Sequence, residues 1–174
     1  VDESGNEISE ECRDMVALFD RKCTTQNEYL HTLLQSGNFL CHPSALVRKS
    51  VLDKIGYFNL LYRQLADYDL WLRLVSESEI TILEKRLIRF QWDIKGKKQI
   101  SMSTRENSVR SFNESVMIRK NYIEKMSEKN FFQFFRGDFQ NPDSTSHLQL
   151  EFEKAFCLMK CTTKEPGLNA TGMQ

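Results

Sequence analysis

Apolar residues recur at helical spacing in several stretches of the chain. In residues 27–35 the apolar side chains, beginning with Tyr29, fall on one face of a helix. Gly37 follows this stretch, and glycine is typical of the position just after a helix. The same spacing predicts further helices over residues 49–55, 66–76, 106–126, 128–135 and 147–161.

Short β-like runs lie between the helices in the first hundred residues. Residues 79–83 and 86–92 have the composition of strands, and a shorter apolar run surrounds Leu46. After residue 104 only helical periodicity is found, and the last residues contain Pro166, Gly167 and little apolar content. The pattern predicts an α/β part over residues 1–103, a helical appendage over 104–163 and a flexible tail over 164–174.

Charge and cysteine content narrow the class of protein. The 24 Lys and Arg residues balance 24 Asp and Glu residues, which argues against a nucleic-acid partner. The five cysteines form no Cys-x-x-Cys pair, a pattern typical of reduced thiols in a cytosolic protein. No long apolar run is present. We therefore expect a cytoplasmic protein, or one peripheral at the inner face of a membrane. Because the sequence begins at Val1 without Met, we expect it to be an internal fragment.

Four motifs follow one another between residues 38 and 73. They read Asn-Phe-Leu-Cys-His-Pro-Ser (38–44), Val-Arg-Lys (47–49), Ile-Gly-Tyr-Phe (55–58) and Ala-Asp-Tyr-Asp-Leu-Trp-Leu-Arg (66–73). In order and spacing they resemble the family 2 inverting glycosyltransferases, downstream of that family's metal-binding Asp-x-Asp. The resemblance covers residues 1–103. It implies the acceptor-side half of a GT-A (Rossmann-like) fold without its nucleotide-binding half.

The resemblance implies a catalytic role for Asp67. In the family, the matching Asp is the general base that takes a proton from the acceptor hydroxyl. That task needs a carboxylate within hydrogen-bond reach of a hydroxyl whose own pKa is too high for it to ionise at neutral pH. An Asp at a helix start is also a common N-cap, and the family motif favours the base. Asp67-Tyr68-Asp69 spells Asp-x-Asp, but its place at a helix start suits the base motif better than a metal motif.

The same resemblance places an acceptor site beside Asp67, and we assign acceptor binding to His42, Asn38 and Asp69. Alternatives stay open for two of them. His42 precedes a proline, and a lone histidine is often a hydrogen-bonded structural group. Asp69 lies four residues before Arg73, a spacing typical of an ion pair within one helix.

The sequence predicts a polar, lysine-rich loop over residues 93–99. Asp93 occupies the place where relatives often carry a histidine near the metal and the diphosphate, and we assign it to a metal site for Mn²⁺ or Mg²⁺. Lys97 and Lys98 are assigned to the donor diphosphate, with a solvated loop as the alternative. Ala66 departs from the family, because many relatives have an acidic residue there. We expect the metal in the intact parent protein and no cofactor bound tightly to this fragment.

Two functions remain open. The first is transfer of a sugar, with inversion, from a nucleotide-sugar donor to a hydroxyl of a carbohydrate or lipid-linked acceptor, in polysaccharide or glycoconjugate synthesis. This chain alone would be inactive. The second is a non-catalytic binding or assembly module. Residues 130–135 and 152–159 carry too many aromatic and apolar side chains for exposed helices, so we expect them to dock on other parts of the protein or to mediate self-association.

Overall fold

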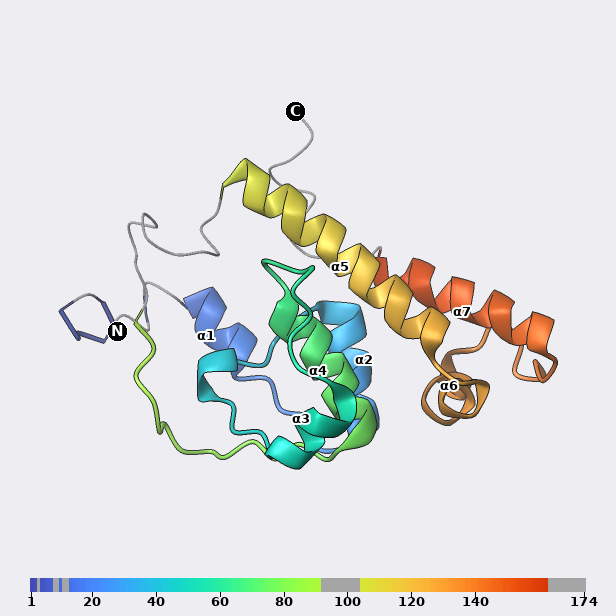
Figure 1. Ribbon diagram of the computed structural model, residues 1–174, viewed down its shortest axis with the longest axis horizontal. Coiled ribbons are helices and arrows are strands. Elements are labelled where there is room, and N and C mark those ends of the chain that lie inside the picture. Colours follow the sequence, from blue (N-terminus) through green and yellow to red (C-terminus); the bar gives the residue numbers. More distant parts are fainter. Residues whose placement is uncertain (3, 8–9, 11–12, 92–103, 163–174) are drawn as a thin grey trace.

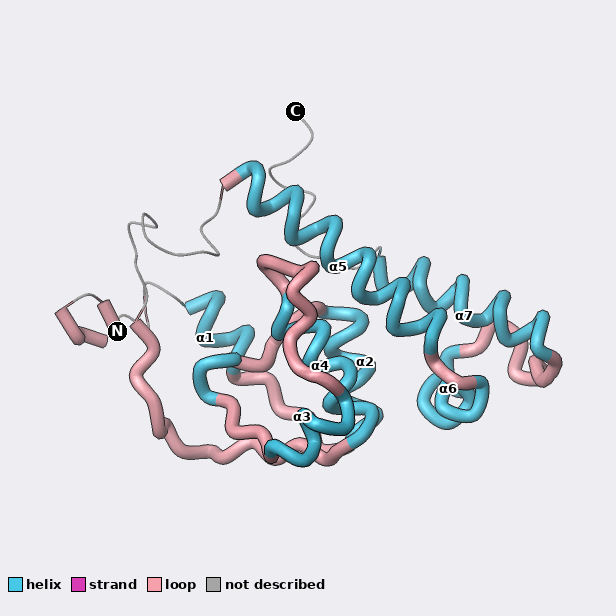
Figure 2. The backbone as a smooth tube through the Cα atoms, in the orientation of Figure 1, coloured by secondary structure: helices cyan, strands magenta, loops and turns pink. Residues whose placement is uncertain are grey.

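The computed structural model describes residues 1–2, 4–7, 10, 13–91 and 104–162. In this part of the chain the regular elements are all helical (Figures 1 and 2). The α-helices are α1 (Arg13–Phe19), α2 (Gln26–Ser36), α3 (Lys49–Ile55), α4 (Ala66–Glu77), α5 (Arg105–Lys125), α6 (Glu128–Phe135) and α7 (His147–Thr162). Two short 3₁₀ turns, η1 (His42–Ser44) and η2 (Arg136–Asp138), complete the set.

The prediction of an α/β, GT-A-like fold is wrong for the described residues, which contain no strand. Residues 79–83 and 86–91, predicted as strands, run mostly without regular structure along the surface. Leu83 and Leu87 are 64% and 67% exposed, and Leu46 is fully exposed. An apolar, β-like composition yields a strand only where a neighbouring backbone completes the hydrogen bonds. No such pairing occurs in the described ranges.

The helix predictions from α2 to α7 are confirmed, with bounds that agree to within two residues. Local chemistry explains one helix start well. Thr25 accepts a hydrogen bond from the backbone N–H of Glu28, and the Glu28 carboxylate accepts one from the N–H of Thr25, so the two form a capping box before α2. Helix α1 was not predicted, because residues 9–25 show no clear apolar period.

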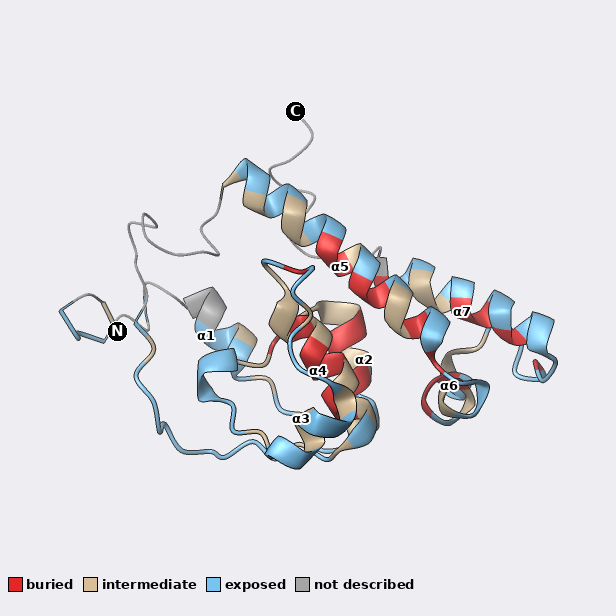
Figure 3. Ribbon diagram, in the orientation of Figure 1, coloured by how far each residue is buried: buried red, intermediate tan, exposed pale blue. Residues whose placement is uncertain are grey.

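Helix α4 lies at the centre of the molecule (Figure 3). It packs against α2, α3 and α5, and its residues Leu72 and Val75 are fully buried. Leu30 and Leu33 of α2 and Ile118 of α5 belong to the same buried cluster. The hydrophobic core therefore joins residues from the first hundred positions to helices from the C-terminal part.

Buried polar groups fix α5 against α4. The carboxylate of Glu114, which is 7% exposed, accepts hydrogen bonds of 2.8–2.9 Å from the backbone N–H groups of Arg63, Gln64 and Leu65. These groups lie just before α4, where the N-cap Leu65 has no side chain that could cap the helix. Glu114 therefore supplies from α5 the acceptor that α4 lacks locally.

The outer face of α7 is apolar. Its side chains Leu148, Phe152, Phe156 and Met159 are between 42% and 67% exposed. No helix in the described ranges combines the length and the apolar character needed to cross a membrane.

Candidate functional site

Asp67 lies in the first turn of α4, two residues after the N-cap Leu65. It is therefore not the N-cap itself. One carboxylate oxygen, Oδ1, accepts a 2.8 Å hydrogen bond from the backbone N–H of Tyr68. The start of a helix favours a negative charge because backbone N–H groups point toward it. The face of α4 that packs into the hydrophobic core holds the backbone of this first helical turn in place.

Asn38 provides the second contact to Asp67. Its side-chain N–H₂ donates a 3.0 Å hydrogen bond to Oδ2 of Asp67, and its Oδ1 accepts one of 3.2 Å from the backbone N–H of Leu40. The amide is thereby oriented with its donor toward the carboxylate. Asn38 lies just after Gly37, in the loop that follows α2, so this loop positions a residue of α4 that is distant in sequence.

Burial raises the pKa of Asp67 above its usual value of 3.8. The hydrogen bonds from Tyr68 and Asn38 and the nearby charge of His42 oppose this effect, because each favours the ionised form. Burial outweighs them. The carboxylate is therefore a stronger base than an ordinary Asp, although its place at a helix start would by itself lower its basicity.

His42 lies in η1 and is exposed. Its ring contacts the rings of Phe58 and Trp71 edge-on, with centroid distances of 5.1 Å and 6.1 Å. The fixed geometry of Pro43 at the start of this turn helps to hold the histidine there. The structure thus brings together Asn38, His42 and Asp67, three of the residues assigned to the site from the sequence.

Asp69 points elsewhere. It forms an ion pair with Arg73, in which Nη2 of Arg73 lies 2.7 Å from Oδ2 of Asp69. The ion pair expected from the spacing of these two residues is therefore confirmed. Arg73 also donates hydrogen bonds to the backbone carbonyl oxygens of Ile55, Gly56 and Tyr57 at the end of α3. The pair joins α4 to α3.

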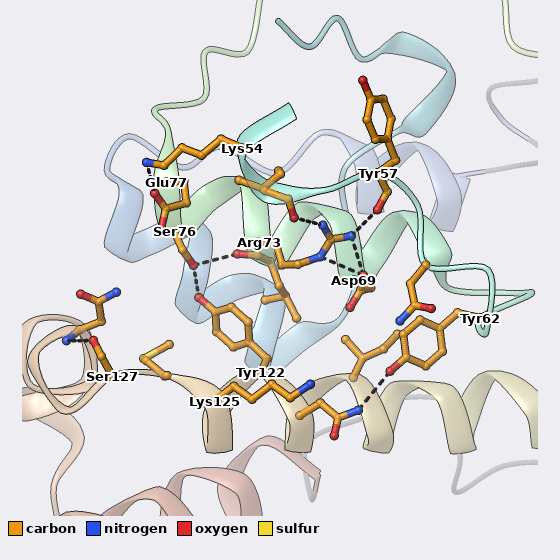
Figure 4. Close-up of a pocket in the computed structure, with 17 residues that line it drawn as sticks. Lys54, Tyr57, Tyr62, Asp69, Arg73, Ser76, Glu77, Tyr122, Lys125 and Ser127 are labelled. Carbon is orange, nitrogen blue, oxygen red and sulfur yellow. Dashed lines mark hydrogen bonds and ion pairs between the residues drawn. The ribbon is translucent and has the colours of Figure 1, made fainter. Parts of the chain in front are cut away.

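A pocket of about 660 Å³ lies beside this pair, between α3, the loop that follows it, α4 and α5. Figure 4 shows Arg73 and Asp69 on the α4 side and Tyr122 and Lys125 on the α5 side. Asp69 lines the pocket, and Asp67 does not. Residues two apart on a helix point in divergent directions. The two carboxylates at the start of α4 therefore lie at two separate sites: Asp69 lines the pocket, and Asp67 does not.

The assignments on the lysine-rich loop lie outside the described residues. These are Asp93 for the metal and Lys97 and Lys98 for the diphosphate. Within the described ranges, no group of three or more His, Cys, Asp or Glu side chains could hold a metal ion.

Two residues that position α4 were not found from the sequence. Glu114 is one of many charged residues on a long helix, and no local motif distinguishes it. Arg119, on the same helix, is fully buried and donates from Nε to the hydroxyl of Tyr68 at 3.1 Å. That hydroxyl donates in turn to the carbonyl oxygen of Leu33 at 2.8 Å. Both residues act across tertiary contacts, which periodicity cannot reveal.

Comparison with known proteins identifies no relative of this chain. The chain matches no protein-family model, no curated protein and no solved structure.

Proposed function

We propose that this chain is the acceptor-activating part of an inverting sugar transferase and that Asp67 is its general base. The observation that carries the proposal is the environment of Asp67. Its carboxylate is partly buried, its pKa is raised, and Asn38 and the backbone of Tyr68 orient it. The proposal concerns the site and its chemistry and does not require a GT-A sheet in this chain.

The chemistry assigned to Asp67 is a single proton transfer. The acceptor hydroxyl donates its proton to a carboxylate oxygen of Asp67 while the hydroxyl oxygen attacks the anomeric carbon of the donor sugar. The bond from that carbon to the nucleotide diphosphate breaks, and the diphosphate leaves with the electron pair. Attack from the face opposite the leaving group inverts the anomeric carbon. A carboxylate of raised pKa suits this step, because a stronger base takes up the proton more completely.

Asn38 and His42 have different roles in this proposal. The Asn38 amide is already bound to Asp67 and Leu40, so Asn38 positions the base. His42 is exposed beside Asp67 and is free to contact an acceptor hydroxyl from solvent. The nucleotide-sugar and its metal would be bound by other parts of the parent protein, and this chain alone would neither bind the donor tightly nor transfer sugar.

The test is turnover in a protein that joins this chain to a nucleotide-sugar-binding half. Release of nucleoside diphosphate is measured with a panel of UDP-, GDP- and dTDP-sugars. Asp67→Asn is expected to lower kcat by about 100-fold or more, with the KM for the nucleotide-sugar nearly unchanged. Asp143→Asn, a matched change at an exposed position, should leave kcat unchanged. Retention of most turnover by Asp67→Asn would show that Asp67 is not the base.

The apolar face of α7 favours a second candidate function, assembly of two copies. Leu148, Phe152, Ala155 and Met159 are exposed and follow the spacing of a coiled-coil seam. In an antiparallel pair, Phe152 would meet the partner's Ala155 and Leu148 would meet the partner's Met159. The large side chain of Phe152 would then face the small one of Ala155 across a two-fold axis, an arrangement that packs well.

Light scattering on the purified chain tests assembly. A dimer that Phe152→Glu converts to a monomer supports this function. Met117→Glu, on an exposed apolar residue of α5, is the matched control and should leave the dimer intact. A monomeric wild-type chain at high concentration would exclude the assembly function while leaving the role of Asp67 open.

A further inference from the structure

We propose that the pocket between α3, α4 and α5 binds a neutral saccharide, at a site separate from Asp67. The proposal goes beyond the catalytic role of Asp67 and does not depend on it. The pocket volume of about 660 Å³ falls within the range of roughly 300–1,000 Å³ that is typical of small-ligand sites. Its lining combines charged residues, neutral polar groups, three tyrosines and apolar side chains.

The cations of the α3 and α4 wall are already neutralised within the protein. Arg73 uses its guanidinium for Asp69 and for the carbonyl oxygens at the end of α3. Lys54 forms an ion pair with Glu77. A phosphate or carboxylate ligand would have to compete with these bonds or rely on Lys125 of α5 alone. The charge pattern therefore favours an uncharged ligand over an anionic one.

Three asparagine side chains in the lining offer unused hydrogen-bonding positions. Asn59 accepts a bond from the N–H of Leu61 through Oδ1, and Asn121 donates one to the hydroxyl of Tyr62 through Nδ2. Within the described residues, the N–H₂ of Asn59, the Oδ1 of Asn121 and the side-chain amide of Asn130 have no partner. Sugar hydroxyls both donate and accept, so amide donors and acceptors around one cavity match them.

Aromatic and aliphatic side chains complete the site. Tyr62 and Tyr122 lie along the α5 side of the pocket (Figure 4), and the buried side chains of Leu72 and Ile118 also line it. The hydroxyl of Tyr122 is hydrogen-bonded to Ser76, which fixes the ring. Tyrosine presents an apolar ring with a polar end, which suits a ligand that carries C–H faces and hydroxyls together. The tyrosine rings, amides and small hydroxyls favour a saccharide over a purely apolar ligand.

The experiment is an NMR titration of the ¹⁵N-labelled chain with three neutral disaccharides, maltose, cellobiose and lactose. At least one is expected to bind with a Kd in the millimolar range and to shift the side-chain amide signals of Asn121 and Asn130. Asn121→Ala and Asn130→Ala should each weaken binding about fivefold or more, which corresponds to one lost hydrogen bond. Asn113→Ala, the same change on an exposed residue of α5 outside the pocket, should leave the Kd unchanged.

Two further variants and one charged probe test whether the ligand is uncharged and whether the binding site is separate from Asp67. Lys125→Met and Asp67→Asn should both leave disaccharide binding unchanged, the first because the ligand is neutral and the second because the site is separate. UDP should not displace the sugar. The proposal is overturned if none of the disaccharides shifts these amide signals, if UDP binds here more tightly, or if Asn113→Ala weakens binding as much as Asn121→Ala. Loss of turnover in Asp67→Asn with disaccharide binding intact would separate this site from the catalytic one.

Discussion

The side-chain amide of Asn38 donates a 3.0 Å hydrogen bond to the carboxylate of Asp67, from the loop after α2 to the first turn of α4. This bond favours the ionised carboxylate, while burial of the carboxylate favours the protonated form. The basicity of Asp67 is therefore set by two opposing effects, and each can be changed by substitution.

Asn38→Ala is expected to raise the pKa of Asp67 further. The substitution removes a donor to the ionised form and leaves the burial of the carboxylate in place. The measurement is an NMR titration that follows the side-chain carboxyl carbon of Asp67 in both proteins. Asn113→Ala, an exposed change on α5, serves as the control and should leave the titration unchanged. A lower pKa in Asn38→Ala would contradict the role assigned to this bond.

Asp67→Asn is expected to stabilise the fold at neutral pH. A pKa raised above 3.8 means that the folded protein holds this proton more tightly than the unfolded chain does. The contribution of Asp67 to stability therefore falls as the pH rises from the unfolded to the folded pKa, and it stays low above that window. Asparagine removes the buried charge, and its one carbonyl oxygen can still accept one of the two hydrogen bonds. The Tm should rise by up to about 3 °C, a shift equivalent to roughly 1 kcal/mol for a chain of this size.

Thermal unfolding between pH 3 and pH 7 tests whether Asp67→Asn changes the stability in the expected direction. The difference in Tm between Asp67→Asn and wild type should be small at pH 3 and should grow as the pH rises. Asp53→Asn is the opposite case, because hydrogen bonds from Tyr57 and Lys49 lower the pKa of Asp53. Its substitution should lower the Tm at neutral pH and have less effect in acid. A Tm difference of the same sign for both variants would contradict this account.

Glu114→Ala is expected to destabilise the protein by about 3 kcal/mol, because it leaves three partly buried backbone N–H groups before α4 without their acceptor. Glu114→Gln keeps one carbonyl oxygen and should cost less. Glu124→Ala on the same helix removes only an exposed ion pair with Lys120 and should cost less than about 1 kcal/mol. Urea unfolding of the three variants gives the comparison. Equal effects of Glu114→Ala and Glu124→Ala would show that the cap contributes little.

The sequence was sufficient to predict helices α2 to α7, and insufficient for α1 and for the β-like segments. Helical periodicity is local, so α2 and α4 to α7 were predicted close to their observed bounds. A strand depends on a partner backbone elsewhere in the protein, and the residues around Leu83 and Leu87 show the apolar pattern without the partner. Glu114 could not be predicted as a cap of α4, because its role arises only when α5 packs against α4.

The sequence predicted the motif of the candidate site, but it predicted the spatial arrangement of the side chains only in part. The resemblance placed Asn38, His42 and Asp67 near one another, and the structure brings these side chains together. It also assigned Asp69 to the acceptor, whereas that carboxylate pairs with Arg73 on the wall of a separate pocket. The divergence of Asp67 and Asp69 follows from helical geometry once the start of α4 is known.

Gly56→Ala is expected to destabilise the protein by about 1–3 kcal/mol, because Gly56 follows α3 with φ 84° and ψ 162°, a region that is essentially restricted to glycine. An added Cβ would lie 3.6 Å from Nη1 of Arg73, an ordinary contact, so the cost is backbone strain alone. Gly56→Asn should cost as much, since asparagine tolerates the left-handed helical region and not this one. Gly137→Ala, where a Cβ meets nothing and φ is not positive, should be neutral or slightly stabilising. The measurement is the urea midpoint of unfolding for each of the three variants. A Gly56→Asn protein as stable as wild type would show that backbone strain does not destabilise substitutions at this turn.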